Sequence, residues 1–237
     1  MSPPWSYCPH CGHTLSAIDN IPVFSYIFLR GKCRYCKGKI SPRYITVELL
    51  TAGLFVLTLH QYPRISSPFA VLGLATAWIF AAFLIVISFI DLEFTIIPNK
   101  IVYPGLVVGF LLAICSAVIQ ADIKLLLHRV LGAIFGAGVI ILIAIAGKAV
   151  FRKEAMGTGD VRLMAMIGMY LGWLPHIFVT LVSAAFLGSI VGLILILVRR
   201  GKMDSVIPFG PFLSAGALLS MLYGENIWIW YRHLMGL

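Results

Sequence analysis

The feature that most constrains this chain is a run of thirty-six residues, 163–198, without a formally charged side chain. A helix that crosses a bilayer needs about 20 mostly apolar residues, so the run is too long for one span. The sequence Gly172-Trp173-Leu174-Pro175 offers a break, because glycine and proline interrupt helices. Over the whole chain 60% of residues are hydrophobic and 11% are charged, against about a quarter charged in soluble domains. The chain is therefore predicted to be an all-α polytopic membrane protein.

Five other apolar stretches are predicted to be spans, which gives about seven transmembrane helices in total. They cover residues 44–60, 69–90, 101–119, 130–150 and 205–224. The short helix that precedes the break is expected to be shallow or partly re-entrant, because it has too few residues to cross fully. No cleavable signal peptide is expected, since the N-terminus is polar and cysteine-rich.

The distribution of lysine and arginine predicts a cytoplasmic N-terminus and an outer C-terminus, because these residues gather in cytoplasmic segments. The fourteen predicted inside are Arg30, Lys32, Arg34, Lys37, Lys39, Arg43, Lys100, Lys148, Arg152, Lys153, Arg162, Arg199, Arg200 and Lys202. The four predicted outside are Arg64, Lys124, Arg129 and Arg232. Orientation and attraction to the lipid bilayer then explain the net charge of +9. No nucleic acid is expected as a partner, because aromatic residues do not alternate with the basic ones.

Residues 1–43 form a polar head that carries four of the five cysteines. The cysteines stand in two pairs, Cys8-Pro9-His10-Cys11 and Cys33-Arg34-Tyr35-Cys36, with twenty-one residues between them. Two such turns can supply the four thiolates of a tetrahedral ion, and structural zinc is the preferred interpretation over an iron site or a redox dithiol. His10 or His13 could replace a cysteine ligand, although a hydrogen bond is the simpler role for each. Metal would supply much of the folding energy of so small a head.

Two aspartates are the candidate catalytic residues. Asp160 follows two glycines in Met156-Gly157-Thr158-Gly159-Asp160, and Asp91 directly follows the span 69–90. Both fall at cytoplasmic ends of predicted spans, so helix packing can bring them together. An ionisable group at membrane depth is costly and is functional by default. Two neighbouring carboxylates that share a proton can activate water and protonate a peptide carbonyl, as in aspartyl proteolysis.

Structural alternatives remain for both aspartates. Asp91 could be an ordinary helix-end acid. Asp160 could cap the short helix, or pair with Arg162 or Lys153. Of the remaining acids, Asp19 is expected in a turn, Glu93 at the solvated interface, and Glu48 in a pair with Arg43 or Lys39. The glycines at 132, 136 and 138 form a small-residue face suited to close helix contact, and the methionines at 156, 164, 166 and 169 are expected to pack.

Several ordered motifs together resemble the bacterial type IV prepilin peptidases. They are Cys8–His13, Asp19–Pro22, Leu29–Cys36, Ile40–Tyr44, Val47–Leu50, Asp91 with Ile97–Asn99, Gly157–Leu163 and Pro208–Phe212. The resemblance implies a multi-pass enzyme of the bacterial inner membrane with Asp91 and Asp160 as the catalytic pair. It also implies metal bound by Cys8, Cys11, Cys33 and Cys36.

The substrates that the resemblance implies are prepilins and pseudopilins, cut after a leader glycine at the cytoplasmic face. It also implies N-methylation of the new terminus with S-adenosylmethionine, for which Glu48 is the one residue suggested. Family members usually have another span ahead of the first cysteine pair, whereas seven residues precede Cys8 here. A trimmed start, or a member without that helix, is therefore expected.

Two functions from other classes remain open. A transporter or ion carrier could use paired acids to bind a cation, although transporter sites usually lie near the bilayer midplane. A non-enzymatic scaffold could use the basic metal head to recruit a cytoplasmic partner. The chain is accordingly divided into a head, residues 1–43, and a transmembrane protease domain, residues 44–237.

Overall fold

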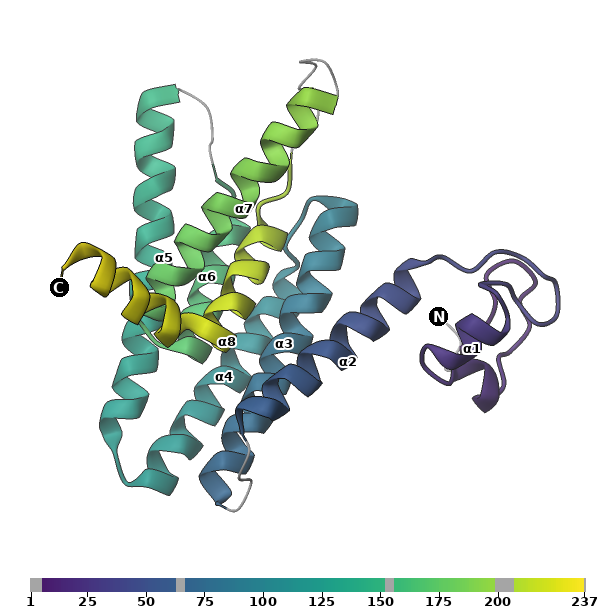
Figure 1. Cartoon of the computed structure of the whole chain (residues 1–237), viewed down its shortest axis with the longest axis horizontal. Helices are drawn as coiled ribbons and strands as arrows, with labels where there is room; N and C mark the ends of the chain where they lie inside the picture. Colours follow the sequence, from purple (N-terminus) through teal and green to yellow (C-terminus); the bar gives the residue numbers. More distant parts are fainter. Residues whose placement is uncertain (1–5, 63–66, 152–155, 199–206, 237) are drawn as a thin grey trace. The chain divides into compact units, whose positions relative to one another are not determined.

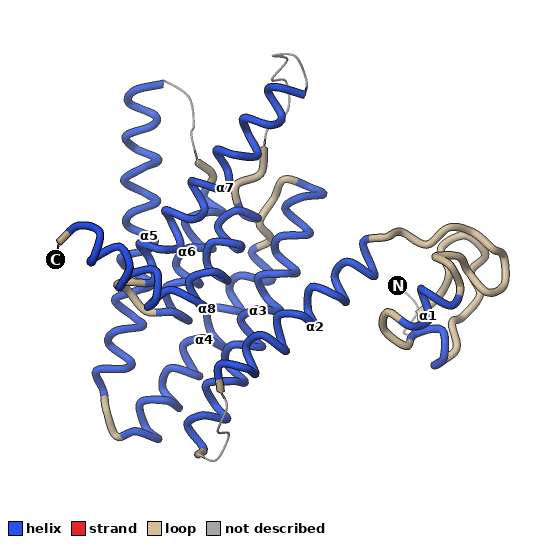
Figure 2. The backbone as a smooth tube through the Cα atoms, in the orientation of Figure 1, coloured by secondary structure: helices blue, strands red, loops and turns tan. Residues whose placement is uncertain are grey.

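The computed structural model describes residues 6–62, 67–151, 156–198 and 207–236. Within these ranges the chain forms eight α-helices, one short 3₁₀ helix and two isolated β-bridges, without a strand (Figures 1 and 2). The predicted all-α class is confirmed. Internal contacts divide the chain into two compact units, Met1–Val56 and Leu57–Leu237.

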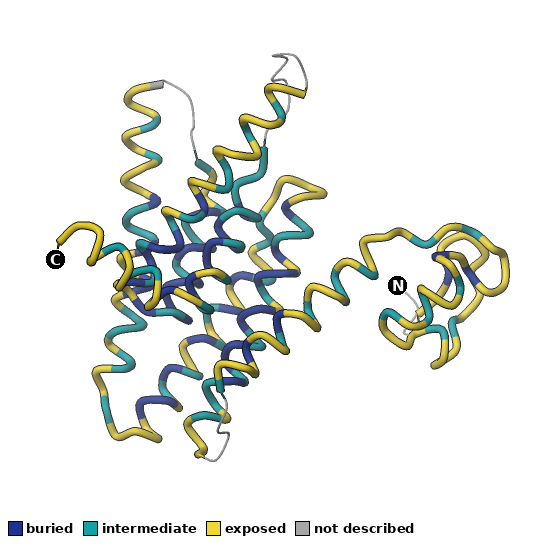
Figure 3. The backbone as a smooth tube through the Cα atoms, in the orientation of Figure 1, coloured by how far each residue is buried: buried dark blue, intermediate teal, exposed yellow. Residues whose placement is uncertain are grey.

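The first unit contains the cysteine-rich head. Its helical elements are η1 (Ala17–Asn20) and α1 (Phe24–Phe28), followed by the start of α2 (Arg43–Gln61). The bridges pair Tyr7 with Thr14 and Lys32 with Lys39, so each bridge closes a loop around one cysteine pair. Few of its residues are buried (Figure 3).

The predicted membrane segments are helical where the structure describes them, except that residues 207–209 of the last one precede its helix. The helices are α2, α3 (Pro68–Phe94), α4 (Asn99–Gln120), α5 (Ile123–Phe151), α6 (Thr158–Leu171), α7 (His176–Val198) and α8 (Gly210–Met235). Among the described residues, five of these helices are long and apolar enough to cross a membrane: α2, α3, α4, α5 and α7. Helix α6 has only fourteen residues, and α8 carries Glu225 and Arg232 in its second half. The first residues predicted for the last span, 205 and 206, lie outside the described ranges.

Two helix boundaries have clear local causes. The predicted break between α6 and α7 is confirmed, because Gly172 ends α6 with φ +84°, a conformation that glycine adopts at little cost. Helix α5 begins seven residues before the predicted start of its span. Its start is capped by Asp122, whose Oδ1 accepts the N–H of Lys124 at 2.9 Å. Lys124 and Arg129 therefore lie in the first turns of α5 rather than in a loop.

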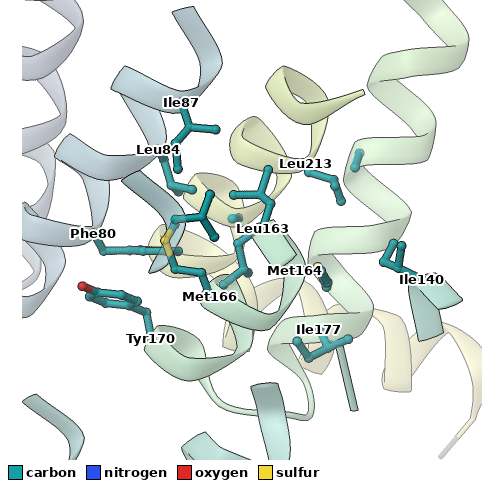
Figure 4. Packing of buried hydrophobic residues seen from close by; sticks show 14 residues of the cluster. Phe80, Leu84, Ile87, Ile140, Leu163, Met164, Met166, Tyr170, Ile177 and Leu213 are labelled. Atoms are coloured by element: carbon teal, nitrogen blue, oxygen red, sulfur yellow. The ribbon is translucent and has the colours of Figure 1, made fainter. Parts of the chain in front are cut away.

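Helix α6 lies at the centre of the second unit. It packs along α5 and also contacts α4, α7 and α8, while α7 packs along α8. Its side chains fill the core, where Figure 4 shows Leu163, Met164 and Met166. These three residues and Ile167 are completely buried. The packing role predicted for the methionines is thereby confirmed for Met164 and Met166. Tyr170 of α6 and residues from α3, α4, α5, α7 and α8 complete the cluster: Phe80, Leu84, Ile87, Val102, Ile140, Ile177, Ala184, Leu213 and Ala217.

Glycines bring α5 and α6 into backbone contact. A β-carbon placed on Gly132 would lie 2.4 Å from the carbonyl carbon of Gly172, and one on Gly168 would lie 2.2 Å from the carbonyl oxygen of Gly132. A β-carbon on Gly136 would lie 3.1 Å from the Met164 oxygen, whereas one on Gly138 would meet nothing within 4 Å. The predicted small-residue contact is thus confirmed at Gly132 and Gly136 and is wrong at Gly138, which faces away.

Candidate active site and metal centre

Asp91 lies in the last turn of α3 and is 4% exposed. Its Oδ2 accepts the N–H of Gly210, the first residue of α8, at 3.0 Å. A β-carbon on Gly210 would lie 2.5 Å from that oxygen, so only glycine lets the backbone approach the carboxylate so closely. Helix α3 ends at Thr95, which adopts the left-handed conformation with φ 53°. Asp91 is therefore held by the neighbouring helix and is not a solvated helix-end acid.

Asp160 lies in the first turn of α6 and is 8% exposed. Its Oδ2 accepts the N–H of Gly157 at 3.1 Å, which caps the helix. The amide dipoles at a helix N-terminus also favour a negative charge at this position. Asp160 therefore caps α6, one of the alternatives considered from the sequence, and this hydrogen bond holds its carboxylate in one orientation.

The structure places the two aspartates beside the same side chain, Ile97, although they lie sixty-nine positions apart in the sequence. Ile97 joins the two halves of the site. A β-carbon on Gly159 would lie 2.9 Å from Ile97 Cβ, and one on Gly210 would lie 3.3 Å from Ile97 Cδ1. The pair of carboxylates is thus built from three helix ends packed around one apolar side chain.

A second link joins the loop after Asp91 to the helix that carries Asp160. The Arg162 guanidinium donates to Asn99 Oδ1, and it donates more weakly to Thr158 Oγ1 at 3.4 Å. Lys153, the other partner considered for Asp160, lies outside the described residues. The Arg162–Asn99 contact therefore fixes the start of α4 against the start of α6, close to both acids.

The sequence reasoning gave no role to Gly210, Ile97 or Asn99. Each stands in a motif that contributed to the family resemblance, 97–99 or 208–212. A glycine between two prolines signals a tight helix start, but nothing local shows that its N–H meets Asp91. That contact depends on how α3 packs against α8.

The four head cysteines form one cluster. The sulfur atoms of Cys8, Cys11, Cys33 and Cys36 all lie within 4.8 Å of one another. An ion with metal–sulfur bonds of about 2.3 Å in a tetrahedron needs sulfur atoms about 3.8 Å apart. Cys8 Sγ and Cys36 Sγ are 3.8 Å apart, so the donor set fits a tetrahedral thiophilic ion such as zinc.

The backbone around each pair prepares the thiols for metal. N–H groups of Cys11 and His10 lower the pKa of Cys8 to about 6, which favours the thiolate. The N–H of Gly38 lowers the pKa of Cys36, but desolvation and the neighbouring thiols outweigh it and raise that pKa to about 11. Four thiolates this close repel one another, so full deprotonation calls for a cation.

The printed sequence has two histidines in the head, and each contacts a group other than the cysteine sulfur atoms. His10 Nε2 lies 3.3 Å from the carbonyl oxygen of Lys39, and the His13 ring lies 3.7 Å from the ring of Tyr35. Hydrogen bonding to the backbone, the simpler role, is thus observed for His10.

Asp19 supports the second cysteine turn. Its carboxylate accepts Ser16 Oγ at 2.7 Å and Arg34 Nε at 2.7 Å, and its side chain is 2% exposed. The Ser16 hydroxyl and then Arg34 lower the pKa of Asp19 despite some desolvation. Because Arg34 stands between Cys33 and Cys36, this ion pair fixes the turn that presents two of the thiols.

Replacing Asp19 with asparagine is expected to destabilise the head by about 1 kcal/mol and to speed metal loss to a chelator. Because the folded-state pKa is lowered, the contribution of Asp19 is complete above the ordinary carboxyl pKa of 3.8 and disappears as the pH falls through the lowered value. Chelator-driven metal release measured at neutral pH checks this, with Asp122→Asn as the control. Equal release rates for the two variants would contradict the role given to Asp19.

Glu48 has a partner that the sequence did not suggest. Its Oε2 accepts the N–H of Val23 at 2.7 Å, whereas Arg43 or Lys39 had been expected. Val23 has φ 64°, an unfavourable conformation for a β-branched residue. Glu48 therefore stabilises the turn that precedes α1.

Comparison with known families covers most of the chain. The model described as Bacterial Peptidase A24 N-terminal domain matches residues 1–62, and the Type IV leader peptidase family model matches residues 78–197. A protein of Aeromonas hydrophila is 37% identical over 230 residues, which are 96% of this chain and 74% of that protein. One of Dichelobacter nodosus is 39% identical over 225 residues, 94% of this chain and 73% of that protein. Both are named prepilin leader peptidase/N-methyltransferase. No solved structure matches.

With five helices apolar enough to cross a membrane among the described residues, and with its match to leader peptidases, the chain is a multi-pass membrane peptidase. The chain belongs to the type IV leader peptidase family. The resemblance seen in the sequence motifs is thereby confirmed.

Proposed function

We propose that this enzyme removes the leader of type IV prepilins and pseudopilins at the cytoplasmic face of the bacterial inner membrane. The observation that carries the proposal is that Asp91 and Asp160, two buried carboxylates from separate helices, both lie beside Ile97. The family match of the chain and the names of its relatives support prepilins as the substrate class.

The proposed chemistry is hydrolysis by a carboxylate pair that holds one proton. Two neighbouring carboxylates do not both ionise at low cost, so one is charged and the other protonated. The charged group takes a proton from water as its oxygen attacks the carbonyl carbon, and the protonated group donates to the carbonyl oxygen. The tetrahedral intermediate then collapses with cleavage of the C–N bond. The aspartate that took the proton from water gives it to the leaving amine, and the other takes back the proton from the hydroxyl oxygen.

The cytoplasmic location is supported by charge. Fourteen of eighteen lysines and arginines lie in segments that this orientation puts inside. Asp91 lies four residues before the end cap of α3, and Asp160 lies in the first turn of α6. Both acids then lie near the cytoplasmic side, where a substrate leader is accessible.

The head, residues 1–43, is proposed to bind structural zinc through Cys8, Cys11, Cys33 and Cys36, with residues 44–237 as the protease domain. Four thiolates complete a tetrahedral shell and leave no open position for catalysis. When bound, the ion would join the two cysteine turns and stabilise a head with few buried residues. Within it, Cys8 and Cys33 are nearly inaccessible, as ligands buried by the fold should be.

Replacing Cys33 with serine is expected to reduce bound zinc from about one ion per chain to almost none. Removing one thiolate opens the shell and leaves three crowded sulfur atoms. Elemental analysis of purified protein checks this, and Cys115→Ser is the matched control because Cys115 lies in α4, outside the cluster. Equal zinc in both variants would reject the four-cysteine site.

N-methylation of the new terminus is proposed from the names of the relatives alone. The described residues contain no strand, and hence no glycine-rich strand–turn–helix that would bind S-adenosylmethionine. The structure uses Glu48 to hold the Val23 turn, so no residue is assigned to methyl transfer.

The proteolytic proposal is tested by co-expression with a reporter prepilin, whose shortening is followed on gels. The wild-type chain is expected to process the reporter, and Asp91→Asn and Asp160→Asn are each expected to leave it full length.

A further inference from the structure

The metal-binding head exposes large apolar side chains that the proposed peptidase chemistry does not use. Ile18, Ile21, Phe24, Ile27 and Phe28, here called the apolar patch, are between 44% and 82% exposed, and Phe28 is the most exposed. Phe24, Ile27 and Phe28 stand at positions i, i+3 and i+4 of α1, so they share one face of the helix. Apolar groups of this size rarely remain in contact with water without a partner.

The outward direction of the patch is fixed by the opposite side of α1. Tyr26 turns toward the head, where its hydroxyl lies 3.5 Å from the carbonyl oxygen of Ile40. A β-carbon on Gly31 would lie 2.9 Å from the same hydroxyl. Because Tyr26 packs against the loop before α2, the face with Phe24, Ile27 and Phe28 points away from the head.

Exposed cations follow the patch in the sequence: Arg30, Lys32, Lys37 and Lys39 come directly after α1. Residues 1–56 contain six lysines and arginines against two acids, a net charge of +4. Both acids, Asp19 and Glu48, accept hydrogen bonds within the head. An exposed apolar face on a basic head complements the surface of an anionic bilayer.

The chain also holds this surface near lipid. Helix α2, which is apolar and long enough to cross a membrane, begins fifteen residues after Phe28. A tether this short gives a high effective concentration, so weak contacts are enough for binding. We propose that the apolar patch and its neighbouring cations form a membrane-docking surface that places Phe24, Ile27 and Phe28 among anionic lipid headgroups. The proposal assumes the cytoplasmic location of the head given above, but not peptidase activity.

Photocrosslinking on the full-length protein tests this proposal. In one variant benzoylphenylalanine replaces Phe28. In a second it replaces Tyr35, which is 47% exposed in the same head but lies outside the patch. Each is reconstituted in nanodiscs of phosphatidylcholine with phosphatidylglycerol, irradiated, and examined by mass spectrometry. Lipid adducts are expected at position 28 at about five times the level at position 35. Equal lipid adducts at both positions, or adducts from position 28 to residues 57–237 or to an added prepilin, would overturn the proposal.

The role of charge is tested separately. Arg30→Gln and Lys32→Gln are each expected to reduce the ratio of lipid-bound to free head by about fivefold. In nanodiscs of phosphatidylcholine alone, this ratio is expected to fall further. Unchanged adducts in all three cases would refute an electrostatic contribution and, with it, the proposed surface. Zinc content shows that the head is folded. Repeating the experiment with Asp91→Asn separates docking from proteolysis, because lipid adducts are expected in the inactive chain as well.

Discussion

Asp91→Asn and Asp160→Asn are each expected to reduce leader cleavage by about 1000-fold or more. The amide has the shape of the carboxylate, and its oxygen can still accept the N–H of Gly210 or Gly157 that the acid accepts now. It can neither take a proton from water nor share one with its neighbour. The loss would therefore be chemical and not structural. The measurement is the rate at which purified variants, reconstituted in lipid, shorten a reporter prepilin.

Glu93→Gln is the matched control for these variants. Glu93 lies two residues after Asp91 on the same helix but is exposed, so its removal is expected to leave the cleavage rate near that of the wild type. A wild-type rate in either aspartate variant would refute the catalytic pair. If the same variants instead altered cation flux, the ion-carrier function would be favoured.

Gly132→Ala is expected to destabilise the bundle by about 3 kcal/mol. The new β-carbon would lie 2.4 Å from a backbone carbon of Gly172, and the backbone, unlike a flexible side chain, can make room only if α5 and α6 separate. The penalty exceeds the gain of about 1 kcal/mol that alanine brings to a helix interior. Unfolding in mixed detergent micelles, followed by circular dichroism, measures the change.

Gly138→Ala provides the comparison on the same helix. A β-carbon there would meet nothing within 4 Å, so only the improved helix propensity remains and stability should stay equal or rise slightly. Equal losses in the two variants would show that α5 tolerates no substitution for reasons other than contact with α6.

The sequence predicted those features that depend on neighbouring residues. Long uncharged runs determine membrane spans. Two Cys-x-x-Cys turns determine a set of metal ligands, because the geometry of each turn brings its two cysteines together. The last span was predicted to end at Gly224, where Glu225 and Arg232 end the apolar signal. The helix itself continues to Met235, since backbone hydrogen bonds do not require apolar side chains.

The candidate site could be predicted only in part. The shared depth of Asp91 and Asp160 follows from the order of the spans, and both acids lie beside Ile97. The contacts that position them come from other elements: Gly210 from α8 and Ile97 from the loop before α4. These depend on the packing of α3, α6 and α8 in three dimensions, which no local pattern encodes.

The fourteen residues of α6 determine how water can reach the reaction. At 1.5 Å per residue this helix is about 21 Å long, whereas the hydrocarbon layer is about 30 Å thick. A helix of this length leaves roughly 9 Å of the layer unspanned. With its Asp160 end at the inner surface, as the distribution of lysine and arginine predicts, its Leu171 end stops short of the outer one. Water at the inner surface then reaches the two acids without crossing lipid.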